Sequence, residues 1–348
     1  MTASEDGTAQ VLDPATGREM CPPLTHDDDI YYARFSPDSR RIGTCSWDHT
    51  ARVWNAATGR LEQTLPHTGQ VVYVEFSPDS RTVLTASYDG RVGLWNADTG
   101  ELRVPLLIHK RPVRHASFDP SGERVVTATT SGTVRVWSVE TGEVLTTFEH
   151  ERYVQHALFD PTGERLITCS HDRTVRVWDP ATGSEVLPPL QHDTQVVFIA
   201  FSPVDRRLLT ISDGGARVWD VETGEPLTPP MKHRNRIIHG EFSPNGKWVV
   251  TAGRDDSARV WDAATGVAVT PPIEHRGTVF SAVFSPDGQW ILTASSDKTA
   301  RIHALTPDLQ PIEELVRLSQ LLSDSRIDET GGLVPLAPET LHQLCQPD

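Results

Sequence analysis

Seven histidines recur along the chain at intervals of 41 or 42 residues. They are His26, His67, His109, His150, His192, His233 and His275. A tryptophan follows at the same place in six of the units, and His303 takes that place in the last. The tryptophans are Trp54, Trp95, Trp137, Trp178, Trp219 and Trp261. A fixed period of about 40 residues indicates one supersecondary unit that is copied and stacked, so the chain must adopt a repeat architecture.

Each unit has the same internal order. An alternating segment ends in "FSP" or "FDP", a short segment such as "TVLTAS" follows, and a tight turn with Asp leads to "ARVW" or a close variant. A "TG" turn then precedes a fourth segment. Four strands in about 40 residues is typical of one β-propeller blade. Proline pairs in the fourth segment predict that these strands are outer edges, because proline cannot donate to a central ladder.

The wording of the repeats carries a family resemblance. Stretches such as "FSPDG", "TCSHDRTVRVW" and "TAGRDDSARVW" resemble the WD-repeat β-propellers over about residues 1–305, and bacterial members most of all. The resemblance rests on seven copies in register. It implies an all-β, seven-bladed WD-repeat propeller with four-stranded antiparallel blades and a protein-interaction function. Some bacterial propellers are appended to a protein kinase, but this sequence contains no Gly-rich loop, HRD or DFG.

The resemblance also implies a structural tetrad in each unit, such as His67, Thr85, Asp89 and Trp95. Each buried polar group would then have a partner, which avoids a cost of ~1–3 kcal/mol for an orphan. Metal ligation or general-base catalysis is the alternative for the histidines, but one histidine per blade around a ring never brings three together. The recurrent arginine two residues before the tryptophan is interpreted as a packing residue rather than a nucleic-acid contact.

Departures from the tetrad predict three weaker blades. Ser131 replaces the aspartate in one unit, Thr210 and Asp213 are one residue too close in another, and His303 replaces the tryptophan in the last.

The two ends of the chain raise separate questions. Residues 2–6, "TASED", align with residues 293–297, "TASSD", so the chain begins in the middle of a blade. We expect the strand around Arg18–Leu24 to complete the seventh blade; the alternative is an incomplete eighth blade, which would lack its inner strand.

Residues 306–348 form a second region, in which "PIEELVRLSQLL" and, more weakly, "APETLHQL" predict helices. This helical tail is expected to cap the propeller, or alternatively to dock another chain.

Composition excludes several function classes. The formal net charge of −15 disfavours binding of nucleic acid by the whole surface. The four cysteines include no CxxC pair, and Cys45 and Cys169 occupy positions where other repeats have alanine, so we expect small buried residues and no metal or other cofactor. No apolar run is long enough for a signal peptide or membrane span. We therefore expect a monomeric, cytoplasmic protein without a membrane partner.

Comparison among the units separates scaffold positions from free ones. In WD-repeat propellers the narrow top face commonly binds peptides, and its variable positions lie three and five residues after the histidine and one before the tight-turn aspartate. These positions predict a partner-binding face made of Asp29, Tyr31, Trp47, Tyr88, Arg114, Tyr153, His171, Arg236, Arg254 and Phe280.

The hypothesis is a polarised site for a protein or peptide partner. One sector, with Phe280, Tyr31, Trp47, Tyr88 and Asp29, would take a basic side chain by cation–π contact. The opposite sector, with Arg114, His171, Arg236 and Arg254, would take acidic residues. Drift at tolerant surface positions is the alternative. No catalytic residues are assigned, because these positions supply no second carboxylate beside Asp29. An enzyme sited in the channel, or a regulatory portion of a longer kinase-containing protein, remain the other functions considered.

Overall fold

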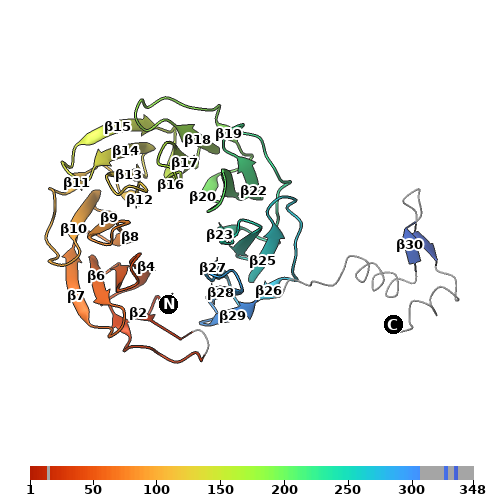
Figure 1. Ribbon diagram of the computed structural model, residues 1–348, viewed down its shortest axis with the longest axis horizontal. Coiled ribbons are helices and arrows are strands. Elements are labelled where there is room, and N and C mark those ends of the chain that lie inside the picture. Colours follow the sequence, from red (N-terminus) through yellow and green to blue (C-terminus); the bar gives the residue numbers. More distant parts are fainter. Residues whose placement is uncertain (14–15, 306–324, 328–332, 336–348) are drawn as a thin grey trace. The chain divides into compact units, whose positions relative to one another are not determined.

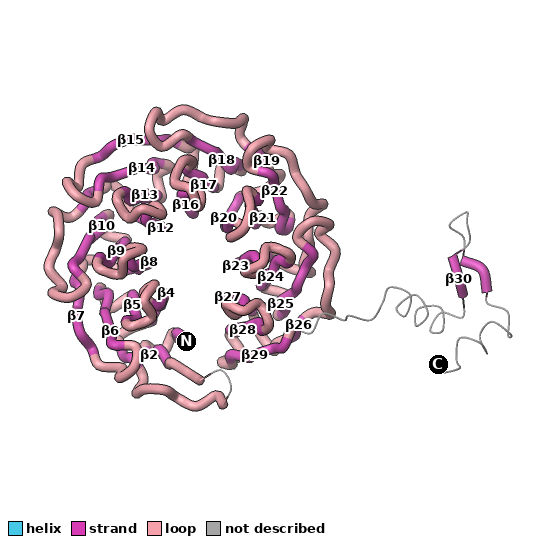
Figure 2. Tube along the Cα trace, in the orientation of Figure 1, coloured by secondary structure: helices cyan, strands magenta, loops and turns pink. Residues whose placement is uncertain are grey.

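The computed structural model describes residues 1–13 and 16–305, together with the backbone of 325–327 and 333–335. The chain divides into two compact units, Met1–Ala304 and Leu305–Asp348. In the first unit, small antiparallel sheets are arranged around a common axis like blades (Figure 1). Figure 2 shows only strands and loops in the described residues, and no helix is among them.

Eight sheets make up this ring, and we number them as blades in chain order. The strands of the first four blades run from the axis outward. Blade 1 has β1 (Thr2–Ala3), β2 (Thr8–Gln10) and β3 (Leu24–Thr25); blade 2 has β4 (Ile30–Phe35), β5 (Arg41–Ser46), β6 (Thr50–Asn55) and β7 (Leu61–Pro66); blade 3 has β8 (Val71–Phe76), β9 (Thr82–Ser87), β10 (Arg91–Asn96) and β11 (Leu107–Ile108); blade 4 has β12 (Val113–Phe118), β13 (Arg124–Thr129), β14 (Thr133–Ser138) and β15 (Val144–Glu149).

The remaining blades repeat this order with small losses at the outer edge. Blade 5 has β16 (Val154–Phe159), β17 (Leu166–Ser170), β18 (Thr174–Trp178) and β19 (Leu190–Gln191); blade 6 has β20 (Val196–Phe201), β21 (Arg207–Ser212) and β22 (Gly215–Asp220); blade 7 has β23 (Ile237–Phe242), β24 (Trp248–Gly253), β25 (Ser257–Asp262) and β26 (Ile273–Glu274); blade 8 has β27 (Val279–Phe284), β28 (Trp290–Ser295) and β29 (Ala300–Ala304).

The proline pairs lie at the outer edges of the blades, as predicted. In blades 5 and 7 the outer strands β19 and β26 have two residues each and directly follow Pro188-Pro189 or lie just after Pro271-Pro272. Blades 2 and 4 have no such pair, and their outer strands β7 and β15 have six residues each. The prolines therefore leave little free edge for another chain to pair with.

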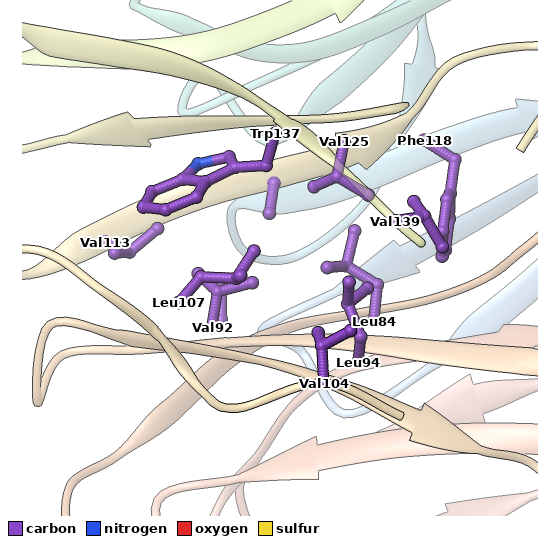
Figure 3. Close-up of a cluster of buried hydrophobic side chains, with 12 residues drawn as sticks. Leu84, Val92, Leu94, Val104, Leu107, Val113, Phe118, Val125, Trp137 and Val139 are labelled. Atoms are coloured by element: carbon purple, nitrogen blue, oxygen red, sulfur yellow. The ribbon is translucent and has the colours of Figure 1, made fainter. Parts of the chain in front are cut away.

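The core lies between neighbouring blades rather than within one. Figure 3 shows the layer between blades 3 and 4, where Leu84 and Leu94 on one sheet pack against Phe118 and Trp137 on the next. Similar clusters occur at the following interfaces. Cys45 and Cys169 are fully buried in these layers, which confirms that they act as small core residues.

The predicted tetrad is complete in blades 2, 5 and 7, whereas in blade 3 His67 Nδ1 lies 3.6 Å from Asp89 Oδ2 and is buried without a hydrogen-bond partner. In blade 2, Trp54 Nε1 donates to Thr44 Oγ1 at 2.8 Å, and His26 contacts Thr44 Oγ1 and Asp48 Oδ2, both at 2.7 Å. Because the hydroxyl accepts from the indole, its own hydrogen points at His26 Nε2, and the imidazole then donates from Nδ1 to the carboxylate. In blade 2 these contacts join Thr44 on β5 and Trp54 on β6 to His26 and Asp48 in the flanking loops, and each of the four groups has a partner.

Three of the arginines that stand two residues before a tryptophan pack on its ring. The guanidinium carbons of Arg135, Arg176 and Arg217 lie 5.5–5.7 Å from the ring centroids of the tryptophans two residues later. This confirms the packing role for these three arginines.

The expected seven blades are wrong: the ring has eight. Residues 1–25 form a sheet of their own, β1-β2-β3, and β3 pairs with β2 instead of completing the last blade. Blade 8 accordingly keeps three strands.

Burial explains why the chain adopts the alternative. Ala9 and Leu24 of blade 1 form one apolar cluster with Ile30, Ile42 and Trp54 of blade 2. The β1–β2 hairpin also closes with the usual tight turn, in which Asp6 accepts from Thr8 Oγ1 at 2.6 Å. The free energy gained by burying the apolar side chains of this sheet against blade 2 outweighs the cost of leaving the sheet without an inner strand.

The expected helical tail is also corrected. In the second unit the described elements are two short strands, β30 (Ser325–Ile327) and β31 (Leu333–Pro335), which pair antiparallel. The segments predicted as helices, 311–322 and 337–344, lie outside the described residues.

Candidate protein-binding face

A β-bulge at the start of every inner strand shapes the top face. In blades 2–8 the pairing of the inner strand with its neighbour skips one residue, the fifth after the histidine. A bulge takes its extra residue out of the ladder and re-aims the side chain. The bulge residues are Tyr31, Val72, Arg114, Gln155, Val197, Ile238 and Phe280. They therefore form a ring around the axis at the top face, on a rigid support.

A second set of variable residues is tied to the same edge by the backbone. The amide N–H of the residue before the tight-turn aspartate donates to the carbonyl of the third residue after the histidine in the same blade. Trp47 donates to Asp29 at 3.0 Å, His171 to Tyr153 at 2.9 Å, and Arg254 to Arg236 at 2.8 Å. The repeat thus places each pair of variable residues side by side.

Arg114 organises the centre of the face. Its Nη2 donates to Tyr31 Oη at 2.5 Å and its Nη1 to Tyr88 Oη at 3.2 Å. The guanidinium carbon also lies 5.1 Å from the centroid of the Tyr31 ring. Three blades therefore contribute to one cluster. Within the described residues no carboxylate lies within ion-pair distance of Arg114.

This cluster changes the predicted division of charge. Arg114 was assigned to the basic sector, opposite the aromatic one, yet it contacts two of the aromatic residues directly. The Tyr31 face that was to receive a basic side chain of the partner is already covered by this guanidinium. The division into two opposite sectors is therefore wrong at this position.

Two further contacts of predicted residues lie in blades 5 to 7. The rings of Tyr153 and His171 are in contact in a tilted arrangement, with their centroids 4.6 Å apart. Burial raises the pKa of Tyr153 to about 12 and lowers the pKa of His171, so both rings are uncharged near neutral pH. Arg236 Nε contacts Asp213 Oδ1 at 2.6 Å.

Sequence reasoning missed the role of Asp213. It was assigned to an imperfect tetrad, but in blade 6 it pairs with Arg236 of the next blade, and His192 Nε2 is buried without a partner. The sequence does carry a signal for this difference: Thr210 and Asp213 are three residues apart, whereas the same pair is four apart in the other units. With one residue removed from the turn, the aspartate cannot reach the histidine of its own tetrad.

The other four residues predicted for the partner-binding face lie apart from the Arg114 cluster. Phe280 is 50% exposed at the bulge of blade 8. Arg254 is exposed, and Trp47 is half-buried with its Nε1 lacking a partner. Asp29 is half-buried beside the exposed Asp27 and Asp28. The structure does not bring these four residues into direct side-chain contact with the Arg114 cluster in the part of the chain that it describes.

Next to the bulges, the following residue of the inner strands in blades 2–7 belongs to an arc of neighbouring rings that the sequence analysis did not single out. Consecutive centroids lie 4.4–5.3 Å apart. The rings are Tyr32, Tyr73, His115, His156, Phe198 and His239. Burial lowers the pKa of His115 to about 3 and that of His239 to about 4, so the arc is neutral.

At the opposite end of the inner strands, a cavity of 520 Å³ opens among the phenylalanines and prolines of the "FSP" and "FDP" turns of blades 2–6. Arg34 and Glu75 form an ion pair at 2.9 Å on its wall.

Across the described residues, no group of three histidine, cysteine or carboxylate side chains could hold a metal ion, and no helix is long and apolar enough to cross a membrane.

Comparisons with known proteins agree with this fold. A family model described as the IFT122 first β-propeller matches residues 112–322, more than half of the chain. A model described as the WD domain, G-beta repeat, matches residues 22–55 and 59–96. Among solved structures, the computationally designed Ika8 protein is 25% identical, with a TM-score of 0.79 over 87% of this chain and 92% of that one.

The curated relatives match over short stretches. WD repeat-containing protein 1 of Mus musculus is 34% identical over 68 residues, which is 19% of this chain and 11% of the relative. Ribosome assembly protein 4 of Chaetomium thermophilum is 31% identical over 62 residues, 17% of this chain and 12% of the relative. The chain thus covers about a tenth of the length of these proteins. The resemblance to bacterial members stays a prediction.

Proposed function

Because the chain belongs to the family of WD-repeat β-propellers that the IFT122 first-propeller model describes, we propose that it is a non-catalytic interaction scaffold whose top face binds a protein or peptide partner. Its recurrent polar residues are engaged inside the blades, so they are not available as nucleophiles or bases. Recognition is then left to the bulge ring and the residues beside it.

The observation that carries the proposal is the environment of Arg114. A guanidinium held by two phenol hydroxyls keeps part of its planar fork for another acceptor, and it has no carboxylate of its own within the described residues. A carboxylate of the partner can supply that acceptor in a charge-assisted hydrogen bond. We therefore propose that an acidic side chain or a C-terminal carboxylate is the anchor, with Tyr31, Tyr88 and Tyr153 providing contact area. His171, Arg236 and Arg254 extend the face toward blade 7.

Selection of random displayed peptides on the intact chain tests this function. The selected peptides should share a carboxylate, and Arg114→Ala should weaken their binding by about tenfold or more, because a buried charged hydrogen bond is lost. Arg111→Ala is the matched control, since it removes the same charge from an exposed residue three positions earlier. Selected peptides without a carboxylate, or equal binding by the Arg114→Ala variant, would refute the assignment.

A further inference from the structure

Five of the blades hold a carboxylate at the same place in the tight turn. In blades 2, 3, 5, 7 and 8 the aspartate of this turn accepts from the backbone N–H of the residue that follows the tetrad histidine. In blade 5, Asp172 also contacts His150 Nδ1 at 2.7 Å and accepts from Thr174 N at 2.9 Å and from Thr174 Oγ1 at 2.6 Å. The Asp172 side chain is 4% exposed. The repeat thus builds one set of donors around a buried carboxylate.

Blade 4 keeps the donors but has no aspartate there. Ser131 stands in its place, and its shorter side chain contacts Thr129 Oγ1 at 3.0 Å and Thr133 Oγ1 at 3.4 Å. The His109 ring is only 7% exposed, and its Nε2 contacts Thr127 Oγ1 at 2.9 Å as in the other tetrads. Its Nδ1 therefore faces the turn. Among the described residues, neither His109 Nδ1 nor Lys110 N has a hydrogen-bond acceptor.

The neighbouring Glu149 does not replace the aspartate. Its Oε2 accepts from Thr133 Oγ1 at 3.2 Å, from a position opposite Thr133 on the outer strand. Blade 7 has Glu274 at the same outer position, opposite Ser257, and still holds its own aspartate 2.8 Å from the tetrad histidine. An outer glutamate and a carboxylate in the turn are therefore compatible.

The surroundings of Ser131 suit an anion that approaches from solvent. Ser131 and Lys110 are both exposed. Arg135 lies beside them, with its Nη1 donating to Ile108 O at 3.3 Å. In blade 2 the counterpart Arg52 has its Nη2 3.4 Å from the carboxylate of Asp48, so this arginine of the repeat adds to the attraction for an anion in the turn.

The turn belongs to the same face as Arg114. Thr130 N donates to Pro112 O at 3.0 Å, which ties the turn to the loop that leads into the bulge at Arg114. Blade 4 lies between blades 3 and 5, away from the N-terminus (Figure 1). Both of its neighbours hold the carboxylate that Ser131 lacks.

We propose that the tight turn of blade 4 is a carboxylate-binding subsite, in which an aspartate or glutamate of the protein partner takes the place of the missing tetrad aspartate. His109 Nδ1, Lys110 N and the Thr133 hydroxyl donate to it, and Arg135 supplies charge. The subsite rests on the proposed function, because it adds a second acidic contact to the partner that Arg114 anchors. Charge-assisted hydrogen bonds of this kind favour carboxylates over neutral groups.

Nuclear magnetic resonance of the histidine-labelled full chain tests the subsite with formate as the probe. At pH 7 the ring signal of His109, assigned from its loss in His109→Gln, should shift saturably with formate. Formamide is the control, since it has the same shape without the charge and should cause no such shift. Ser131→Asp should abolish the formate response, because its own carboxylate then occupies the turn.

The same variant tests whether the donors accept a carboxylate at all. Burial, with a smaller contribution from Arg135, lowers the pKa of His109 to about 4. In Ser131→Asp this pKa should rise, because a carboxylate beside Nδ1 stabilises the imidazolium. An unchanged pKa in the folded variant would overturn the proposal, and so would a His109 signal that ignores formate or responds equally to formamide.

Peptides selected on the intact chain connect the subsite with the partner. Those with two carboxylates should bind Ser131→Asp about tenfold or more weakly, because the new carboxylate blocks and repels theirs. Ser184→Asp is the matched control, since it adds the same charge at an exposed serine in the "TG" turn of blade 5. Circular dichroism establishes that both variants are folded.

The two proposals fail in different ways. If Arg114→Ala weakens peptide binding and Ser131→Asp does not, the proposed function stands and the subsite is refuted. If only Ser131→Asp weakens binding, the subsite stands and the Arg114 anchor is refuted. A formate response without any effect of Ser131→Asp on peptide binding would mean an adventitious ion only, and it would overturn the subsite.

Discussion

At the scale of single residues, the periodic side chains are held inside the blades and the irregular ones provide the surface chemistry. The histidine, threonine and tryptophan of a tetrad are joined inside the blade, as in blade 3, where Thr85 Oγ1 contacts His67 Nε2 and accepts from Trp95 Nε1, both at 2.8 Å. Arg114, in contrast, occupies a position that varies among the repeats and meets two tyrosines from other blades.

Truncating a tetrad tryptophan should cost much of the stability of the propeller. Trp95→Ala removes a 5%-exposed indole, leaves a cavity and takes away one of the two hydrogen bonds of the Thr85 hydroxyl, so the free energy of unfolding should fall by ~3–5 kcal/mol. Urea denaturation monitored by circular dichroism measures the change. Trp290→Ala is the control, because Trp290 is 45% exposed and its loss should cost much less. Equal losses for the two variants would contradict the role of Trp95.

Buried imidazoles should make the propeller sensitive to mild acid. Burial, with a smaller contribution from the neighbouring arginine in each case, lowers the pKa of His109 and of His192 to about 4. The unfolded chain protonates these rings below about pH 6.5. It therefore binds more protons than the folded chain between about pH 6.5 and 4, and stability falls as the pH drops through that window.

Each such ring removes up to about 1.4 kcal/mol of unfolding free energy per pH unit within the window. Urea midpoints measured from pH 7.5 to 4.5 should decline from about pH 6.5 downward, and His192→Gln should flatten the decline. A midpoint that stays constant until the carboxylates titrate near pH 4 would contradict this account.

At the scale of elements, turns and bulges decide where side chains point. The bulge that begins each inner strand recurs in seven blades, so it is a feature of the repeat and not an adaptation to one ligand. Sequence comparison located the variable positions, because the spacing from the histidine is constant. It could not show which of them touch, since Arg114 reaches across two blade interfaces to Tyr31.

The tight turn of blade 4 offers a test at this scale. Gly132 has φ +100°, and an added Cβ would clash with the carbonyl of His150 and lie 3.0 Å from that of Arg152. Gly132→Ala should therefore destabilise the fold by more than the ~1–2 kcal/mol that a left-handed conformation costs by itself. Gly17→Ala isolates the conformational part, because Gly17 has φ +67° and nothing within 4 Å of its Cβ position. Thermal melts that shift equally for both would show that the carbonyl contacts are unimportant.

At the scale of the whole molecule, the order of the strands was predictable and the closure of the ring was not. The alignment of residues 2–6 with 293–297 correctly indicated that the chain begins in the middle of a blade. The choice between seven and eight blades depended on whether residues 18–24 pack on the last blade or stay with β2. That choice depends on burial between blades, which no local pattern records.

Placing a charge in blade 1 tests the eight-bladed ring. Ala9 is 1% exposed in the cluster with Ile30 and Trp54, so Ala9→Asp should lower the melting temperature and weaken hydrogen-exchange protection in β4 and β5. Ala57→Asp, in an exposed turn, should change neither. Unaltered protection in β4 and β5 of a folded Ala9→Asp variant would favour a ring in which the N-terminal strands pack elsewhere.

The amino-acid sequence by itself determined the blade: its strand order, its tetrad, its proline-bearing outer edge and the positions that are free to vary. These features depend on contacts within about 40 residues and are written seven times, so each copy corroborates the others. Only the tertiary structure decided the number of blades, the ion pair of Asp213 with Arg236, and the seating of Arg114 between Tyr31 and Tyr88. Those outcomes depend on how blades pack against one another, because side chains far apart in the sequence compete there for burial and for partners.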